Sequence, residues 1–227
     1  MPKSTFANLP EAKRQAIIDL AVAEFAEHPY QVASLSRIVE RAGIAKGSIY
    51  QYFENKQELY LFILEYAAQR QLEQLRALEP PDPELEVFAL LRWQMQASVQ
   101  VGLAAPQLTK LMYRAVTDDL PFRDEVARRL QSAGEAHLRA LLARGVERGE
   151  LDPSLDLELA AFVLRRLTAD LHELIVRRLG LTLEEAAADV ALMSSPEAER
   201  LYDQIIEILQ FGLARRAQPT GSPGGPA

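Results

Sequence analysis

The side chains best suited to chemistry gather in one short segment, and they favour hydrogen bonding rather than the breaking of covalent bonds. They follow one another on a short polar helix face: Lys46, Gly47, Ser48, Tyr50 and Gln51. A lysine in such a place can donate to guanine O6 and N7, and a glycine lets the backbone come close to a base pair. Residues 33–57 have four basic and two acidic side chains, a local excess of +2, whereas the whole chain carries −7. The sign of this local charge suits contact with DNA.

The chain offers little to an enzyme or to a metal site. It has no cysteine, which excludes disulfides, thiolate zinc sites and a cysteine nucleophile. No Glu-x-x-His or His-x-x-x-His spacing joins its three histidines, His28, His137 and His172. No glycine-rich phosphate loop follows a strand, and the carboxylate pairs at 118–119 and 184–185 are typical of helix ends. We therefore expect no catalysis, no metal and no cofactor.

Two helices must precede the polar segment and hold it in place. Pro10 opens the first, which ends near His28 because a proline follows and cannot continue a helix. Ser34 is a natural N-cap for the second, Leu35–Ala42. Gly43 comes directly after it and can take the positive φ of a tight turn.

The polar segment itself is expected to form a third short helix over 46–52, with Ile49 and Phe53 pointing inward. A break at Glu54-Asn55-Lys56 separates it from a long helix, Gln57–Leu78. Two short helices joined by a glycine turn are the arrangement of a helix-turn-helix.

A proline-rich linker at residues 80–83 separates these helices from the remainder of the chain. Beyond it the apolar spacing predicts five helices: Glu84–Ala104, Pro106–Arg114, Phe122–Arg148, Asp156–Leu179 and Pro196–Arg216. A shorter helix at Leu183–Leu192 fits the pattern, and the tail 218–227, rich in Pro, Gly and Ser, is expected to be disordered. A composition dominated by Ala, Leu, Glu and Arg agrees with an all-α fold.

Residues 8–64 closely resemble the DNA-binding domain of the TetR (tetracycline-repressor) family. The resemblance rests on the turn Ala-Gly-Ile-Ala at 42–45 and on Lys-Gly-Ser-Ile-Tyr-x-Tyr-Phe-x-Asn-Lys at 46–56, which is a specific signature. The remainder is similar to the family in length and helical layout. The resemblance implies three parts: an N-terminal three-helix helix-turn-helix domain at 1–56, a C-terminal helical bundle for ligand sensing and dimerisation at 57–217, and the tail at 218–227. A helical hairpin with a solvated polar face is the alternative.

Carried over position by position, the resemblance implies two kinds of DNA contact. The residues expected near base edges are Ser36, Lys46, Gly47 and Tyr50. Those expected to hold phosphates are Ser34, Arg37, Ser48, Tyr52 and Lys56. Gln51 belongs to the same polar face. Tyr50 and Tyr52 lie two positions apart and therefore cannot share one helix face.

A single recognition helix reads only a few base pairs, so a useful site needs two copies about 34 Å apart on a palindrome. In the family the last two long helices of each subunit pair in a four-helix bundle, which implies a homodimer here. Both predicted helices have the apolar stripe that this requires. The implied interface residues are Phe162, Leu167, Leu171, Leu174, Leu201, Ile205, Ile208 and Leu209. The alternative for these residues is the core of a single subunit.

The family's middle helices usually enclose a ligand cavity, which implies one between the three predicted helices after the linker. Its aromatic and apolar lining would be Phe88, Trp93, Met95, Tyr113, Leu141 and Phe162. The polar groups that orient a ligand would be Arg92, Gln96, His137 and Arg166. Core packing is the alternative for the aromatic residues, and solvation or ion pairing for the two arginines.

The resemblance thus implies a dimeric repressor that binds double-stranded DNA at a palindromic operator and is released by a small-molecule effector. Similarity of the motif to members that regulate fatty-acid or acyl-CoA metabolism implies an apolar or amphipathic effector. A regulator controlled by a protein partner, or by no effector, is the alternative. A non-specific architectural role is opposed by residues 61–227, which carry the whole −7. No 18-residue stretch lacks charge and the start has no apolar signal segment, so we expect a cytoplasmic protein with no membrane partner.

Overall fold

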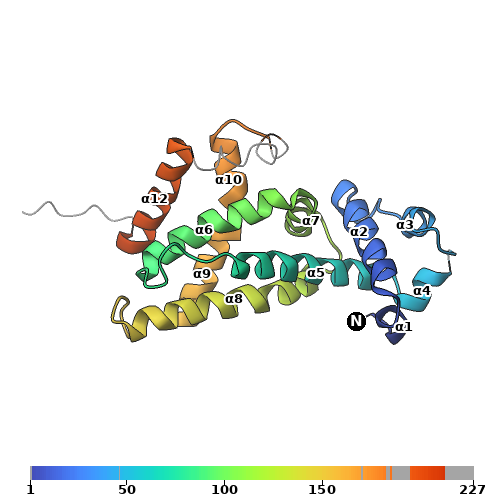
Figure 1. Cartoon of the computed structure of the whole chain (residues 1–227), viewed down its shortest axis with the longest axis horizontal. Coiled ribbons are helices and arrows are strands. Elements are labelled where there is room, and N and C mark those ends of the chain that lie inside the picture. The colour runs from blue at the N-terminus through green and yellow to red at the C-terminus, as the bar shows by residue number, and fades with distance from the viewer. Residues whose placement is uncertain (1, 46, 170, 183–184, 186–194, 213–227) are drawn as a thin grey trace, which may run out of the picture.

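The computed structural model describes residues 2–45, 47–169, 171–182, 185 and 195–212. Every regular element in these residues is a helix, which confirms the predicted all-α fold (Figure 1). The N-terminal helices are α1 (Ser4–Ala7), α2 (Glu11–Glu27), α3 (Leu35–Arg41), α4 (Ser48–Tyr52) and α5 (Lys56–Ala77). The later ones are α6 (Val87–Ala104), α7 (Pro106–Thr117), α8 (Arg123–Glu147), α9 (Leu157–Ala169), α10 (Leu171–Arg178) and α12 (Pro196–Phe211).

Most helix ends follow the signals in the sequence, and the exceptions have local causes. α2 starts directly after Pro10 and ends before His28, as predicted. α6 starts at Val87 rather than at Glu84, because Asp82 Oδ1 accepts a hydrogen bond from the Glu84 N–H at 2.9 Å and holds the chain in a turn. The sequence did not predict α1, because four residues are too few to show a helical period.

The C-terminal part follows the prediction except at its last helix. The helix predicted at Asp156–Leu179 corresponds to α9 and α10, and residue 170 between them lies outside the described residues. α12 ends at Phe211, well before Arg216, because Gly212 has a φ of 73° and leaves the helical region there. The tail and nearly all of the segment Leu183–Leu192 lie outside the described residues.

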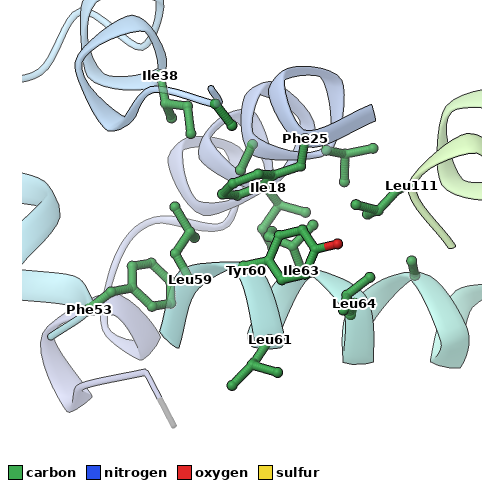
Figure 2. Close-up of a cluster of buried hydrophobic side chains, with 14 of the residues drawn as sticks. Ile18, Phe25, Ile38, Phe53, Leu59, Tyr60, Leu61, Ile63, Leu64 and Leu111 are labelled. Carbon is green, nitrogen blue, oxygen red and sulfur yellow. The ribbon is translucent and has the colours of Figure 1, made fainter. Parts of the chain in front are cut away.

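The first of two hydrophobic cores joins the N-terminal helices to α5, α7 and the start of α8. It contains Ile18 of α2, Ile38 of α3 and Leu111 of α7, all almost inaccessible to solvent. Figure 2 shows Tyr60 and Leu64 of α5 on the side of that helix that faces α2, with Leu111 nearby. Each such side chain stabilises the fold by about 1.5–3 kcal/mol. The polar segment is therefore anchored to the same core as α7.

The second core fills the other end of the molecule. Its members include Leu91 and Met95 of α6, Leu142 of α8, Ile175 of α10 and Tyr202 of α12. The helices α5, α6 and α8 run side by side along the long axis, and α9 crosses them (Figure 1). α5 thus begins beside the helix-turn-helix and extends toward the second core.

Candidate nucleic-acid interface

The end of α3 sets the turn that leads into α4. Gly43 directly follows Ala42, the C-cap of α3. It has a φ of 63°, which only glycine adopts readily. The Ile44 N–H then donates to the Val39 carbonyl oxygen at 3.1 Å and closes the turn. The predicted glycine turn is therefore present in the structure.

α4 presents a polar face to solvent while its other side is buried. Ile49 and Phe53 lie in the first core, as predicted from the apolar spacing. Tyr50 is 51% exposed, and Gly47 and Gln51 are also exposed. Ser48 is half-buried, and Ser36 on α3 is exposed. Lys46 lies outside the described residues.

Tyr52 lies on the opposite side of α4 from Tyr50. It is only 7% exposed, and its ring lies 5.7 Å from that of Phe6 on α1, centroid to centroid. The two-residue spacing predicted this opposition. The ring of Tyr52 belongs to the core. The phosphate contact expected of Tyr52 would therefore have to be made at the edge of the interface with DNA.

Glu24 of α2 holds the start of α3 in place. Its carboxylate is 2% exposed and accepts from Arg37 Nη2 at 2.5 Å and Nε at 3.0 Å. It also accepts from the Ser34 N–H at 2.7 Å, and the Ser34 hydroxyl oxygen in turn accepts from the Arg37 N–H at 3.4 Å. Ser34 and Arg37, both expected to hold phosphates, are therefore engaged within the subunit.

The charge on Glu24 is stabilised by this pairing. Burial alone would raise the pKa of Glu24, but the guanidinium of Arg37 and the N–H of Ser34 outweigh burial and lower it. Sequence reasoning did not assign a role to Glu24. The available signal was a carboxylate within the apolar stripe of the first helix, since a charge at such a position requires a partner.

Lys56, at the first position of α5, is also held by neighbours. Its ammonium lies 4.7 Å from the centre of the Tyr30 ring and donates to the Gln31 carbonyl oxygen at 3.3 Å. Burial lowers the pKa of Lys56. The side chain bridges α5 to the segment between α2 and α3.

The residues predicted to line a ligand cavity fall into different surroundings. Met95 and Leu141 are buried in the second core, and Phe88 packs against it. Trp93 and Tyr113 are half-buried. Phe162 and Arg166 are exposed on α9, so they do not belong to the interior of the subunit, contrary to the expectation.

Two of the predicted polar groups join α6 to α12 instead of standing free. Arg92 pairs with Glu199 at 2.5 Å and with Asp203 at 2.7 Å. Gln96 Nε2 donates to Glu199 Oε1 at 2.6 Å. Ion pairing, the alternative for Arg92, therefore holds in the structure.

His137 is half-buried between α8 and α6. The Gln94 side-chain nitrogen, which can only donate, lies 3.0 Å from His137 Nε2, so this ring nitrogen accepts. Burial and the positive charge of Arg76 lower the pKa of His137. Both effects disfavour the charged imidazole.

A groove with a volume of about 360 Å³ lies where α2, α5 and α7 meet. None of the predicted cavity residues lines it. Its walls are Gln15, Asp19, Val22, Tyr66, Arg70, Gln74, Gln107 and Leu108.

The residues predicted to form a dimer interface divide into two groups. Leu171 is 3% exposed and belongs to the second core, while Leu174, Leu201, Ile205 and Leu209 are half-buried. The others lie within a set of large apolar side chains that are 43–59% exposed on α9 and α12. We call this set the apolar face: Leu159, Phe162, Val163, Leu167, Ile208 and Phe211.

No helix among the described residues is long and apolar enough to cross a membrane. No group of three or more His, Asp or Glu side chains in the same residues is placed to hold a metal ion.

Solved structures share this fold. A TetR family regulator from Chloroflexus aurantiacus has 36% sequence identity and a TM-score of 0.68, and the match covers 95% of this chain and 100% of that one. The regulator FadR from Bacillus subtilis, solved in complex with stearoyl-CoA, has 20% identity and a TM-score of 0.62 over 88% of this chain and 99% of that one.

Curated relatives agree with the structural neighbours. A probable acrEF/envCD operon repressor of Escherichia coli is 28% identical over 158 residues, which cover 66% of this chain and 70% of that protein. A fatty acid metabolism regulator protein of Bacillus subtilis is 27% identical over 154 residues, which cover 65% of this chain and 75% of that protein. These relatives are regulators rather than enzymes, as the sequence predicts for this chain.

Two family models match the two parts of the chain. The model of bacterial regulatory proteins of the tetR family matches residues 17–62, and the tetracyclin repressor-like C-terminal domain matches residues 85–214. The first match contains α3 and α4, and the second contains the helices of the second core. The chain therefore belongs to the TetR family of transcriptional regulators.

Proposed function

We propose that the chain is a homodimeric repressor that binds a palindromic operator through α4 and releases it when an amphipathic effector binds. The observation that carries the proposal is the exposed polar face of α4, held on a buried apolar side. Tyr50 and Gln51, with Gly47 and Ser36, would approach base edges, as would Lys46. Ser48 and Lys56 would contact phosphates. Ser34, Arg37 and Tyr52, which are engaged within the subunit, would contact phosphates at the edge of the interface.

The apolar face supports the homodimer. Six large apolar side chains are exposed on α9 and α12, and burial of these side chains against a second copy would remove them from water. Both helices also bury side chains in the second core, so the face is carried on a fixed body. We assign the interface to the apolar face, with Leu174, Leu201, Ile205 and Leu209 at its margin, and leave Leu171 to the core of the subunit.

The effector is proposed to be a fatty acid or an acyl-CoA. Support comes from the similarity to the fatty acid metabolism regulator of Bacillus subtilis and from the apolar side chains of the second core. The site would lie between α6, α7 and α8, where Phe88, Trp93, Met95, Tyr113 and Leu141 would contact the chain of the ligand. His137 would offer a polar group. A regulator that answers to a protein partner, or to no effector, is the alternative.

Selection from a random duplex library tests DNA binding. The purified chain is expected to enrich a palindrome whose half-sites lie about one helical turn apart, and recovery of unrelated sequences would contradict the proposal.

Binding to the enriched operator is then titrated with stearoyl-CoA, stearate and CoA. We expect stearoyl-CoA to lower operator affinity and CoA to leave it unchanged. An unchanged affinity with all three would favour the alternative. A repressor of this kind acts in the cytoplasm, where the DNA is.

A further inference from the structure

The recognition helix α4 cannot complete its own hydrogen bonding. It has only five residues, and no side chain caps its N-terminus. The last carbonyl groups of any α-helix lack partners within the helix. In α4 the Ile49 carbonyl oxygen accepts from the Phe53 N–H at 2.9 Å, which leaves the carbonyls of Tyr50, Gln51 and Tyr52 to find partners elsewhere.

All three carbonyls are satisfied by the N-terminal segment. Lys3 Nζ donates to the Tyr50 oxygen at 2.8 Å, and the Lys3 N–H donates to the Tyr52 oxygen at 2.9 Å. The Thr5 hydroxyl donates to the Gln51 oxygen between them. Figure 1 shows α1 packed beside α4. Three donors from Lys3 and Thr5 therefore take the place of the missing next turn of the helix.

Charge and packing reinforce these bonds. The ammonium of Lys3 lies at the C-terminal end of α4, where the helix dipole favours a positive charge. Phe6 of α1 is 2% exposed, and its ring lies 4.8 Å from that of Phe53 and 5.5 Å from that of Phe62, centroid to centroid. Phe6 fixes the segment to the first core, so Lys3 and Thr5 act from an anchored position.

We propose that Lys3 and Thr5 are positioning residues for operator recognition, because they hold the backbone of Tyr50 and Gln51 in the orientation that reads the groove. The inference rests on the proposed function, since it names residues that act through α4. Neither side chain needs to touch DNA. A helix this short is only marginally stable alone. Loss of hydrogen bonds at its C-terminal end should therefore change the positions of the residues that face the bases.

The test uses the full-length chain and the operator enriched from the random library. Thr5→Val keeps the shape and removes only the hydroxyl. Operator affinity is expected to fall about three- to tenfold, the effect of one lost hydrogen bond, while affinity for unrelated DNA and its salt dependence stay unchanged. Thr5→Ser should restore binding. The double variant Lys3→Met/Thr5→Val should lose at least about tenfold.

Controls separate positioning from loss of charge or of fold. Lys13→Met removes one exposed positive charge from α2 and is expected to leave the preference for the operator intact. Thermal unfolding of each variant shows that the fold persists, since both substituted side chains are exposed. A double variant that is folded and binds operator as tightly as the wild type would overturn the inference.

Hydrogen exchange in the absence of DNA tests the positioning role of Lys3 and Thr5 independently of the proposed function. The Phe53 amide, bonded to Ile49, should exchange about three- to tenfold faster in the double variant than in the wild type. Unchanged exchange would overturn the positioning role even if the chain binds an operator. Failure of the wild type to enrich any operator would instead count against the proposed function, while the exchange rates still decide whether Lys3 and Thr5 hold α4.

Discussion

Arg114 of α7 donates through Nε to the carbonyl oxygen of Ala26, 2.9 Å away in the last turn of α2. Its Nη2 donates to the Glu27 carbonyl oxygen at 3.3 Å, and its Nη1 lies 3.6 Å from Asp118. A helix from the C-terminal part thus places a positive charge at the C-terminal end of α2. We expect a displacement of α7 to be transmitted to α2 and, through Glu24, to α3.

Arg114→Met should weaken both stability and regulation. It leaves two carbonyls at the end of α2 and the half-buried Asp118 without their partner, so we expect the free energy of unfolding to fall by about 1–2 kcal/mol. We also expect the effector to reduce operator affinity less than in the wild type. Thermal unfolding and an operator titration with and without stearoyl-CoA measure the two effects.

Arg128→Met is the matched control, because Arg128 is an exposed arginine on α8. It should change neither quantity. If Arg114→Met lowers stability yet leaves the effect of the ligand unaltered, the link between α7 and α2 does not carry the regulation.

Glu24→Gln should destabilise the fold in a manner that depends on pH. The pKa of Glu24 is lowered in the folded state from its ordinary value of 4.5, so the charged form stabilises the protein above that pH. This contribution is lost as the pH falls through the folded-state pKa. At pH 7 we expect the free energy of unfolding to fall by about 1–2 kcal/mol, the difference between a charged and a neutral hydrogen bond.

Denaturant unfolding from pH 7 down to pH 3 gives the comparison. The difference between wild type and Glu24→Gln should shrink below about pH 4.5. A difference of constant size across this range would show that folding does not lower the pKa of Glu24.

Leu167→Glu should convert the proposed homodimer to a monomer. A charge placed within the apolar face cannot be desolvated against a second copy, while in the free subunit it stays in water. Light scattering over a range of protein concentrations should give the mass of one chain. Operator affinity should fall at least about a hundredfold, because half of the palindrome goes unread.

Val116→Glu provides the comparison for this change. Val116 is 52% exposed on α7, outside the apolar face, so the same substitution there should leave the dimer intact. A dimer that survives Leu167→Glu would place the interface elsewhere on the molecule.

Tyr50→Phe should reduce affinity for the operator and broaden the sequences that are bound. Loss of one hydroxyl hydrogen bond to a base edge should cost about 0.5–1.5 kcal/mol, which is about two- to twelvefold in affinity. Tyr66→Phe removes a phenol hydroxyl on α5 that bonds to Gln15 and should have no such effect. Equal behaviour of the two variants would remove Tyr50 from the reading of bases.

The features that sequence predicts well here depend on local chemistry. Pro10, Ser34 and Gly43 each act within a few residues of the chain, so their effects on helix ends are visible without a structure. The buried and exposed sides of α4 follow from the spacing of Ile49 and Phe53. The polar face of α4 was therefore predictable. Which polar side chains are engaged within the subunit was not.

The features that sequence misses depend on partners far apart in the chain. The ion pairs between helices are examples, because Arg37 of α3 pairs with Glu24 of α2 and Arg92 of α6 pairs with Glu199 of α12. Exposure of Phe162 likewise results from how α9 packs, which an apolar stripe cannot specify. The role of Thr5 arises from a contact made 46 positions away, at Gln51.

Specificity of DNA binding is the sharpest test of operator recognition by a homodimer. Affinity of the wild-type chain is measured at about 0.15 M salt for the enriched palindrome and for a duplex of the same composition in scrambled order. We expect a preference of at least about a thousandfold for the palindrome, with two chains bound to each duplex. Equal affinity for the two duplexes, or one chain bound to each, would contradict it.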